Sequence, residues 1–133
     1  DSGGKAGGGM VRKVKSFEDL LVWQKAVGLA KKVYHCTSQE PLSRDYGLRN
    51  QIRRASVSIS ANIAEGYERG SRKDYVRFLT MAKGSAGEVR SLLRLALEVG
   101  HLDRNSYTSC SAACSEISRY LSNLITALRS KDR

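Results

Sequence analysis

The side chains best suited to binding chemistry in this sequence are cations in the middle of the chain. They are Arg49, Arg53, Arg54, Arg69, Arg72, Lys73 and Arg77. Guanidinium groups bind phosphate oxygens through two parallel hydrogen bonds, and the nearby rings of Tyr67 and Tyr75 can stack on unpaired bases. This combination predicts a surface for structured RNA or another nucleic acid. The alternative is an ordinary solvated face whose cations pair with Glu68 and Asp74.

The overall charge agrees with an anionic partner without identifying it. The 133 residues include 23 Lys and Arg against 13 Asp and Glu, a formal charge of +10. The excess is spread along the chain, and its largest share falls in residues 43–77, which carry +4. A basic surface attracts polyanions at long range, so charge alone indicates a class of partner rather than a ligand.

Side chains for catalysis are sparse, and we expect no enzyme activity and no cofactor. General acid–base catalysis needs a group that titrates near neutral pH, yet neither His35 nor His101 has an obvious carboxylate or nucleophile partner in the sequence. There is no phosphate-binding loop, because the glycines of KGSAGE at 83–88 lie inside a helical pattern. We expect Glu65 to pair with Arg69, four residues on, and Asn62 to bond a neighbouring backbone group.

The three cysteines favour a reduced chain rather than a metal or disulfide site. Cys110 and Cys114 are four residues apart, but a metal would need two further ligands, and both histidines are distant in sequence. We interpret the cysteines as small apolar residues. No run reaches the roughly 18 apolar residues that span a bilayer, and no signal peptide follows Met10. The sequence therefore predicts a cytoplasmic protein.

A central helix positions Arg49, Arg53 and Arg54; it is predicted to begin between residues 43 and 46 and to run to about residue 65. Its main apolar stripe, at steps of three and four residues, is Leu48, Ile52, Ala55, Ile59 and Ile63. A second, narrower stripe holds Tyr46, Val57 and Ala64, with Arg53 among them. Two apolar faces cannot be covered by one neighbour, so we predict that the second stripe contacts another copy of the chain. Gly66 is expected to end this helix in a left-handed conformation.

Three further helices are predicted around it. One spans residues 17–37, with Ser16 and Asp19 as a capping box; the next begins near Arg72 after a cap at Ser71; the last follows Asp103 as N-cap.

Gly84 and Gly87 fall within the third helix, and we interpret them as a close approach to Ser56 and Ser60 of the central helix. The alternative is a local bend.

Four helices and no strand pattern predict an all-α protein, an antiparallel up-down-up-down four-helix bundle. We expect one domain over residues 16–129. Residues 1–9, DSGGKAGGG, are interpreted as an expression remnant, residues 10–15 as a flexible segment and residues 130–133 as a frayed tail.

Three segments resemble one known family across nearly the whole natural chain. They are FEDLLVWQKA at 17–26, QIRRASVSISANIAEG at 51–66 and SRKDYVRFLTMAKGSAGEVRSLL at 71–93. They are similar to the 23S rRNA intervening sequence proteins, four-helix bundles related in fold to accessory proteins of diversity-generating retroelements. The resemblance implies a homo-oligomer, with five-fold rings. The chain departs from the family pattern at Ser60, where relatives often have proline, and in its serine-rich last helix.

Two functional hypotheses remain open. The first is a non-catalytic, oligomeric binder of structured RNA or other nucleic acid. The second is a protein-interaction adaptor or assembly scaffold, whose basic face meets an acidic or nucleic-acid-bound partner protein.

Overall fold

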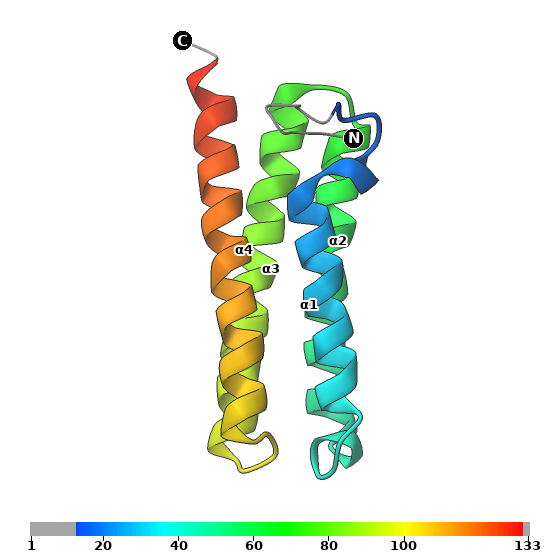
Figure 1. Ribbon diagram of the computed structural model, residues 1–133, viewed down its shortest axis with the longest axis vertical. Coiled ribbons are helices and arrows are strands. Elements are labelled where there is room, and N and C mark those ends of the chain that lie inside the picture. The colour runs from blue at the N-terminus through cyan, green and yellow to red at the C-terminus, as the bar shows by residue number, and fades with distance from the viewer. Residues whose placement is uncertain (1–12, 132–133) are drawn as a thin grey trace, which may run out of the picture.

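The computed structural model describes residues 13–131, and Figure 1 shows an elongated helical bundle. The predicted remnant at 1–9, residues 10–12 of the predicted flexible segment and residues 132–133 lie outside the described range. The α-helices are α1 (Leu21–Thr37), α2 (Tyr46–Glu68), α3 (Arg72–Glu98) and α4 (Arg104–Ser130). Two short 3-10 helices are η1 (Phe17–Asp19) and η2 (Leu42–Arg44). No strand occurs within residues 13–131, so the predicted all-α four-helix bundle is confirmed.

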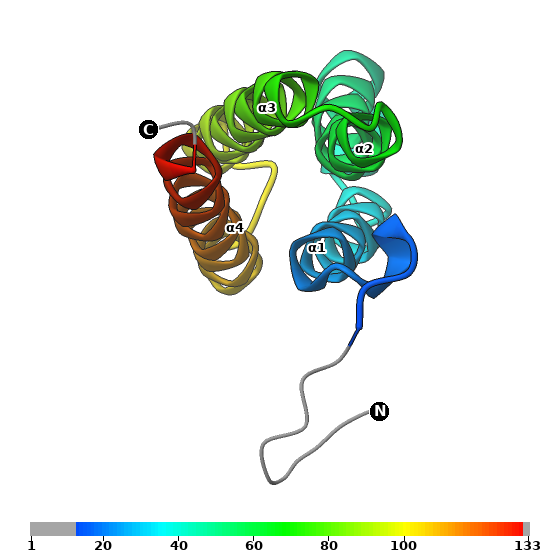
Figure 2. The same ribbon diagram turned by 90° about the horizontal axis from the view of Figure 1, so that it is seen from above.

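The helices follow one another around the bundle in chain order. Figure 1 shows the links between successive α-helices at alternate ends of the bundle. In the view along the bundle, α2 lies between α1 and α3, and α4 lies beyond α3 (Figure 2). The most extensive packing is between α2 and α3, whereas α1 and α4 pack least extensively of the neighbouring pairs.

The core is formed by the inward stripe of each helix. Ile52, Ile59 and Ile63 of α2 are 0% exposed and share one buried cluster with Leu79 and Leu93 of α3. Burying each such side chain contributes roughly 1.5–3 kcal/mol. The main stripe predicted for the central helix therefore faces its own bundle.

The first α-helix begins later than predicted. The Asp19 carboxylate accepts hydrogen bonds from the backbone N–H groups of Lys15 and Ser16, at 2.9 and 3.3 Å. This capping interaction closes η1, and Leu20 is then extended, so α1 starts at Leu21 rather than at residue 17. The break lets the Phe17 ring pack edge-on against Trp23, with centroids 5.3 Å apart.

The predicted end of the central helix at Gly66 is wrong. Helix α2 continues to Glu68, and the left-handed residue of the α2–α3 link is Gly70, with φ 83°. Gly66 is buried, and a Cβ atom there would lie 2.7 Å from the Cβ of Phe78. Glycine is required at position 66 because α2 and α3 approach closely there.

The predicted close approach at Gly84 and Gly87 is also wrong. Both glycines are exposed, and a Cβ atom at either would meet no heavy atom within 4 Å. At this level of the bundle, α2 and α3 are joined instead by the hydroxyl groups of Ser58 and Ser85, 3.0 Å apart. The prediction failed because α3 is oriented with these two glycines facing outward, away from α2.

The other helix ends follow local capping rules. The predicted caps are confirmed, since Ser71 Oγ accepts from the Asp74 N–H and the Asp103 carboxylate accepts from the Ser106 N–H. Helix α4 includes Ser130, the first residue of the predicted tail. Between residues 13 and 131, no helix has the length and apolar character needed to cross a bilayer.

Candidate nucleic-acid interface

The α2–α3 link brings together four of the predicted phosphate-binding side chains at one end of the bundle. Arg69 caps α2, while Arg72 and Lys73 begin α3 and Arg77 follows one turn later; all four are exposed. The link is short because Gly70 turns the chain and Ser71 at once caps the next helix. We call these four residues the link cluster.

The link cluster is held in place by weak surface contacts. Arg69 pairs with Glu65 at 2.9 Å, which confirms that predicted contact, and Arg77 lies 3.6 Å from Asp74. Both guanidinium groups also lie over the ring of Phe78, with Cζ 4.9 and 4.5 Å from its centroid. Exposed ion pairs contribute only about 0–1 kcal/mol to the free energy of folding. A phosphate group can therefore replace the carboxylate of Glu65 or Asp74 at little cost in free energy.

A shallow pocket adjoins the link cluster. It has a volume of about 190 Å³ and is lined by Tyr67, Gly70, Ser71, Arg72, Tyr75 and Leu128. The rings of Tyr67 and Tyr75 meet edge to face, with centroids 6.0 Å apart. Burial raises the pKa of Tyr75 to about 12, with smaller contributions from Tyr67 and Tyr120, so its ring stays neutral at physiological pH. The pocket wall therefore includes an aromatic ring that carries no charge.

The remaining predicted arginines of α2 do not join the link cluster. Arg49 lies near the opposite end of α2, where its guanidinium donates to the Ser43 carbonyl at 3.0 Å and lies over Tyr46. Arg54 is exposed on the middle of α2. Four of the predicted cationic residues thus form the link cluster, whereas Arg49, Arg53 and Arg54 occupy separate positions along α2.

Arg53 is engaged within its own bundle. Its Nε donates to the buried Thr37 hydroxyl at 2.8 Å, and a terminal nitrogen donates to Ser38 Oγ at 3.1 Å. Its Cζ lies 4.5 Å from the centroid of the Tyr34 ring. These contacts fasten the end of α1 to α2. Helical spacing could not reveal them, because residues 37 and 53 belong to different helices.

Replacing Arg53 with alanine should lower the free energy of unfolding by about 1–2 kcal/mol, since charge-assisted hydrogen bonds and ring contacts are lost. Urea denaturation followed by circular dichroism would measure this loss. The matched control, Arg54→Ala on the same helix, should change the free energy by less than about 0.5 kcal/mol. Equal effects of the two substitutions would contradict a fastening role for Arg53.

The second stripe of α2 lies outside the core. Tyr46 and Val57 are 64% and 44% exposed, Ala64 is half-buried, and Tyr34 of α1 is exposed beside Arg53. This arrangement leaves apolar surface on the α1–α2 side of the chain. Three of the four residues predicted to contact a second copy, Tyr46, Val57 and Ala64, therefore keep solvent-exposed surface, whereas Arg53 is engaged within its own bundle.

The histidines and cysteines form no metal site within residues 13–131. Cys36, Cys110 and Cys114 are all buried thiols. His101 does have a carboxylate neighbour that sequence distance concealed, since its Nδ1 lies 3.2 Å from Asp45 Oδ2. That carboxylate also caps α2, so the contact joins the α3–α4 link to the start of α2.

Comparison with known proteins agrees with the fold. Residues 18–123 match the family model of the 23S rRNA-intervening sequence protein. A crystal structure of a protein with unknown function, from the S23 ribosomal protein family of Bacteroides thetaiotaomicron, is similar at a TM-score of 0.73. The two chains are 28% identical, over 79% of this chain and 98% of the other. No curated protein matches the sequence. The family match extends from η1 through most of α4, and the chain therefore belongs to the 23S rRNA-intervening sequence protein family.

Proposed function

We propose that this protein is a non-catalytic, self-assembling protein that binds structured RNA through the link cluster. The observation that carries the proposal is the gathering of Arg69, Arg72, Lys73 and Arg77 beside a pocket walled by two tyrosines. Cations bind the phosphates, and the pocket receives a base that RNA leaves unpaired.

The chemistry of the cluster favours RNA with single-stranded features. Bases in loops and bulges are free to stack on aromatic rings, whereas bases inside a duplex are not. Such a stack contributes roughly 1–3 kcal/mol for each base. The phosphates on either side of the base would then meet Arg72 and Lys73, which begin α3.

Self-assembly would strengthen this binding. The second stripe of α2, in which Tyr46 and Val57 are exposed and Ala64 is half-buried, together with Arg53, supports a contact between copies, and the family resemblance implies a pentamer. A ring repeats the link cluster in each copy, so weak contacts act together on one RNA. Sedimentation should give a mass several times the 14.7 kDa of a single chain. A well-folded monomer at high concentration would refute the assembly.

The test of RNA binding is a titration of labelled hairpin RNA across a salt series. We expect affinity to fall steeply with salt, because each phosphate contact releases counterions. The double substitution Arg72→Gln with Lys73→Gln should weaken binding and make the salt slope shallower by about 1 per side chain.

A matched control removes the same charge elsewhere. Lys31→Gln with Arg104→Gln alters exposed cations of α1 and α4 away from the α2–α3 link, and should leave the salt slope nearly unchanged. Equal weakening by both pairs, or binding that ignores salt, would argue against the link cluster as the site.

A second candidate function is a protein-interaction adaptor. It is favoured by the exposed apolar side chains Tyr34, Tyr46 and Val57, which suit a protein partner better than an RNA. This function predicts a stable assembly with negligible RNA binding at low salt. The same titration therefore separates the two candidates.

A further inference from the structure

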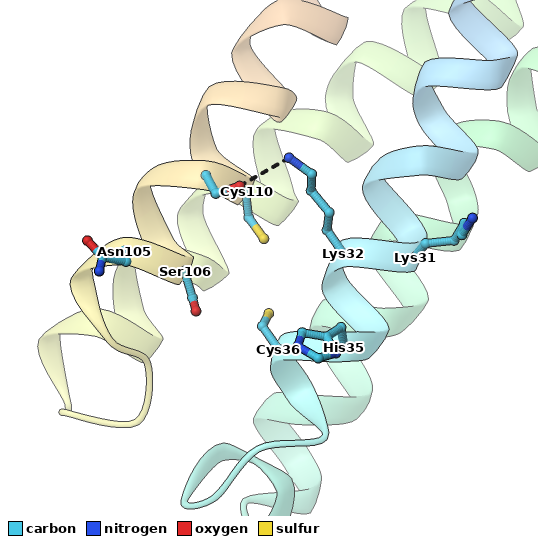
Figure 3. Close-up of a pocket in the computed structure, with 8 residues that line it drawn as sticks. Lys31, Lys32, His35, Cys36, Asn105, Ser106 and Cys110 are labelled. Carbon is cyan, nitrogen blue, oxygen red and sulfur yellow. Dashed lines mark hydrogen bonds between the residues drawn. The ribbon is translucent and has the colours of Figure 1, made fainter.

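A pocket between α1 and α4 contains the clearest chemistry outside the link cluster. Its volume is about 460 Å³, and it is lined by Lys31, Lys32, His35, Cys36, Asn105, Ser106, Ser109 and Cys110. Figure 3 shows the sulfur atoms of Cys36 and Cys110 pointing toward each other from facing helices. Residues 74 positions apart in sequence thus form a pair of thiols in one pocket.

The position of this pair differs from that of the third cysteine. Cys36 and Cys110 are 5% and 3% exposed and line the pocket, so small molecules that enter it can meet their sulfur atoms. Cys114 is 0% exposed and does not line the pocket. The chain therefore supplies an internal comparison between accessible and sealed thiols.

The surroundings of the pair favour a division of roles. The neighbouring Cys36 thiol, followed by the charge of Lys32, lowers the pKa of Cys110. Lys32 is held at the pocket by its hydrogen bond to Ser109 Oγ, at 3.1 Å. The interaction with Cys110, followed by burial, raises the pKa of Cys36. Cys110 is thus the better source of a thiolate, which is the nucleophilic form of cysteine, and Cys36 keeps its proton.

We propose that Cys36 and Cys110 are a redox-modifiable thiol pair, which hydrogen peroxide entering the pocket converts to a disulfide between α1 and α4. The Cys110 thiolate attacks one peroxide oxygen; the O–O bond breaks, a sulfenic acid forms, and the departing hydroxide becomes water on protonation. The sulfur of Cys36 then attacks the Cys110 sulfur. An S–S bond forms, the S–O bond breaks, and the hydroxyl group leaves as water with the Cys36 proton. Two thiols are oxidised by two electrons, and one peroxide is reduced to two waters.

The bond would join the two helices that hold each other least tightly. Helices α1 and α4 are the first and last, and they pack least extensively of the neighbouring pairs, so they can move relative to each other more easily than the other pairs can. A disulfide between these helices encloses most of the chain in one loop, which restricts the unfolded state. Oxidation should therefore raise Tm by roughly 5–15 °C, reversibly on reduction.

The test oxidises the folded, full-length protein with hydrogen peroxide, then alkylates it in denaturant and maps the peptides by mass. The expected result is a fall from three free thiols to one, with residues 36 and 110 in a single cross-linked peptide. The control Cys114→Ser should keep the cross-link, whereas Cys36→Ser and Cys110→Ser should abolish it. Three thiols retained, a bond to Cys114, or cross-links only between chains would each overturn the proposal.

The pH dependence of alkylation gives a second measurement that needs no variant. Iodoacetamide reacts with thiolates, so Cys110 should become reactive at a lower pH than an ordinary thiol. Burial raises the pKa of Cys114 to about 12, so that thiol should stay protonated and unmodified at neutral pH. Faster labelling of Cys114 than of Cys110 in the folded protein would overturn the assignment of Cys110 as the attacking group.

Discussion

Replacing Gly66 with valine should lower the free energy of unfolding by about 3 kcal/mol. Even the Cβ atom would lie 2.7 Å from Phe78 Cβ, which is closer than carbon atoms can pack, and at a tight 3.3 Å from Tyr75 Cδ1. Phe78 Cβ is bonded to the backbone of α3, so relief requires a shift of the helix rather than of a flexible side chain. Thermal and urea unfolding would measure the loss.

The same substitution at Gly84 provides a matched control. Gly84 also lies inside an α-helix, but it is exposed, and a Cβ atom there meets nothing within 4 Å. Valine and glycine differ in helix propensity by only a few tenths of a kcal/mol, so Gly84→Val should change stability by less than about 0.5 kcal/mol. A Gly66→Val protein as stable as Gly84→Val would show that α2 and α3 do not approach closely at Phe78. The disruption should also reach the pocket beside the link cluster, because Tyr75 lines that pocket and lies next to Gly66.

Replacing Ile59 with alanine should lower the free energy of unfolding by about 2–5 kcal/mol. Ile59 is 0% exposed in the middle of α2, within the cluster that joins all four helices, so truncation leaves a cavity that rigid neighbours cannot fill. Chemical denaturation at several protein concentrations would measure the effect. The loss should be the same at each concentration if Ile59 serves only its own bundle.

The control for Ile59 lies two residues away on the second stripe. Val57 is 44% exposed, and Val57→Ala should change the stability of an isolated chain by less than about 0.5 kcal/mol. If copies assemble through this stripe, however, the loss at Val57 should depend on protein concentration, because dissociation then precedes unfolding. A large, concentration-independent loss at Val57 would mean that both stripes are buried within one chain.

The bundle itself was predictable because its signals are local. Ser71 and Asp103 cap the helices that follow them, and the stripe through Ile52, Ile59 and Ile63 faces the core as its spacing predicted. The link cluster was predictable for the same reason. A short link holds the end of one helix beside the start of the next, whatever the rest of the chain does.

The glycines mark where local reasoning failed. Gly66, Gly84 and Gly87 look alike in sequence, since each interrupts or ends a helical pattern. Only Gly66 lies at a close approach, whereas the other two face outward. The distinction depends on how far α3 is rotated about its own axis relative to α2. The spacing of apolar residues indicates which face of a helix is buried, but it does not fix that rotation closely enough to separate the three glycines.

By itself, the sequence determined the class of the fold, the ends of most helices and the basic character of the α2–α3 link, because capping and helical periodicity act over three or four residues. Only the tertiary structure decided that Arg53 fastens Thr37, that His101 meets Asp45 and that Cys36 faces Cys110. Each of these pairs joins side chains from separate elements. Their meeting depends on the rotation and axial offset of whole helices, and those are set by the packing of the entire core.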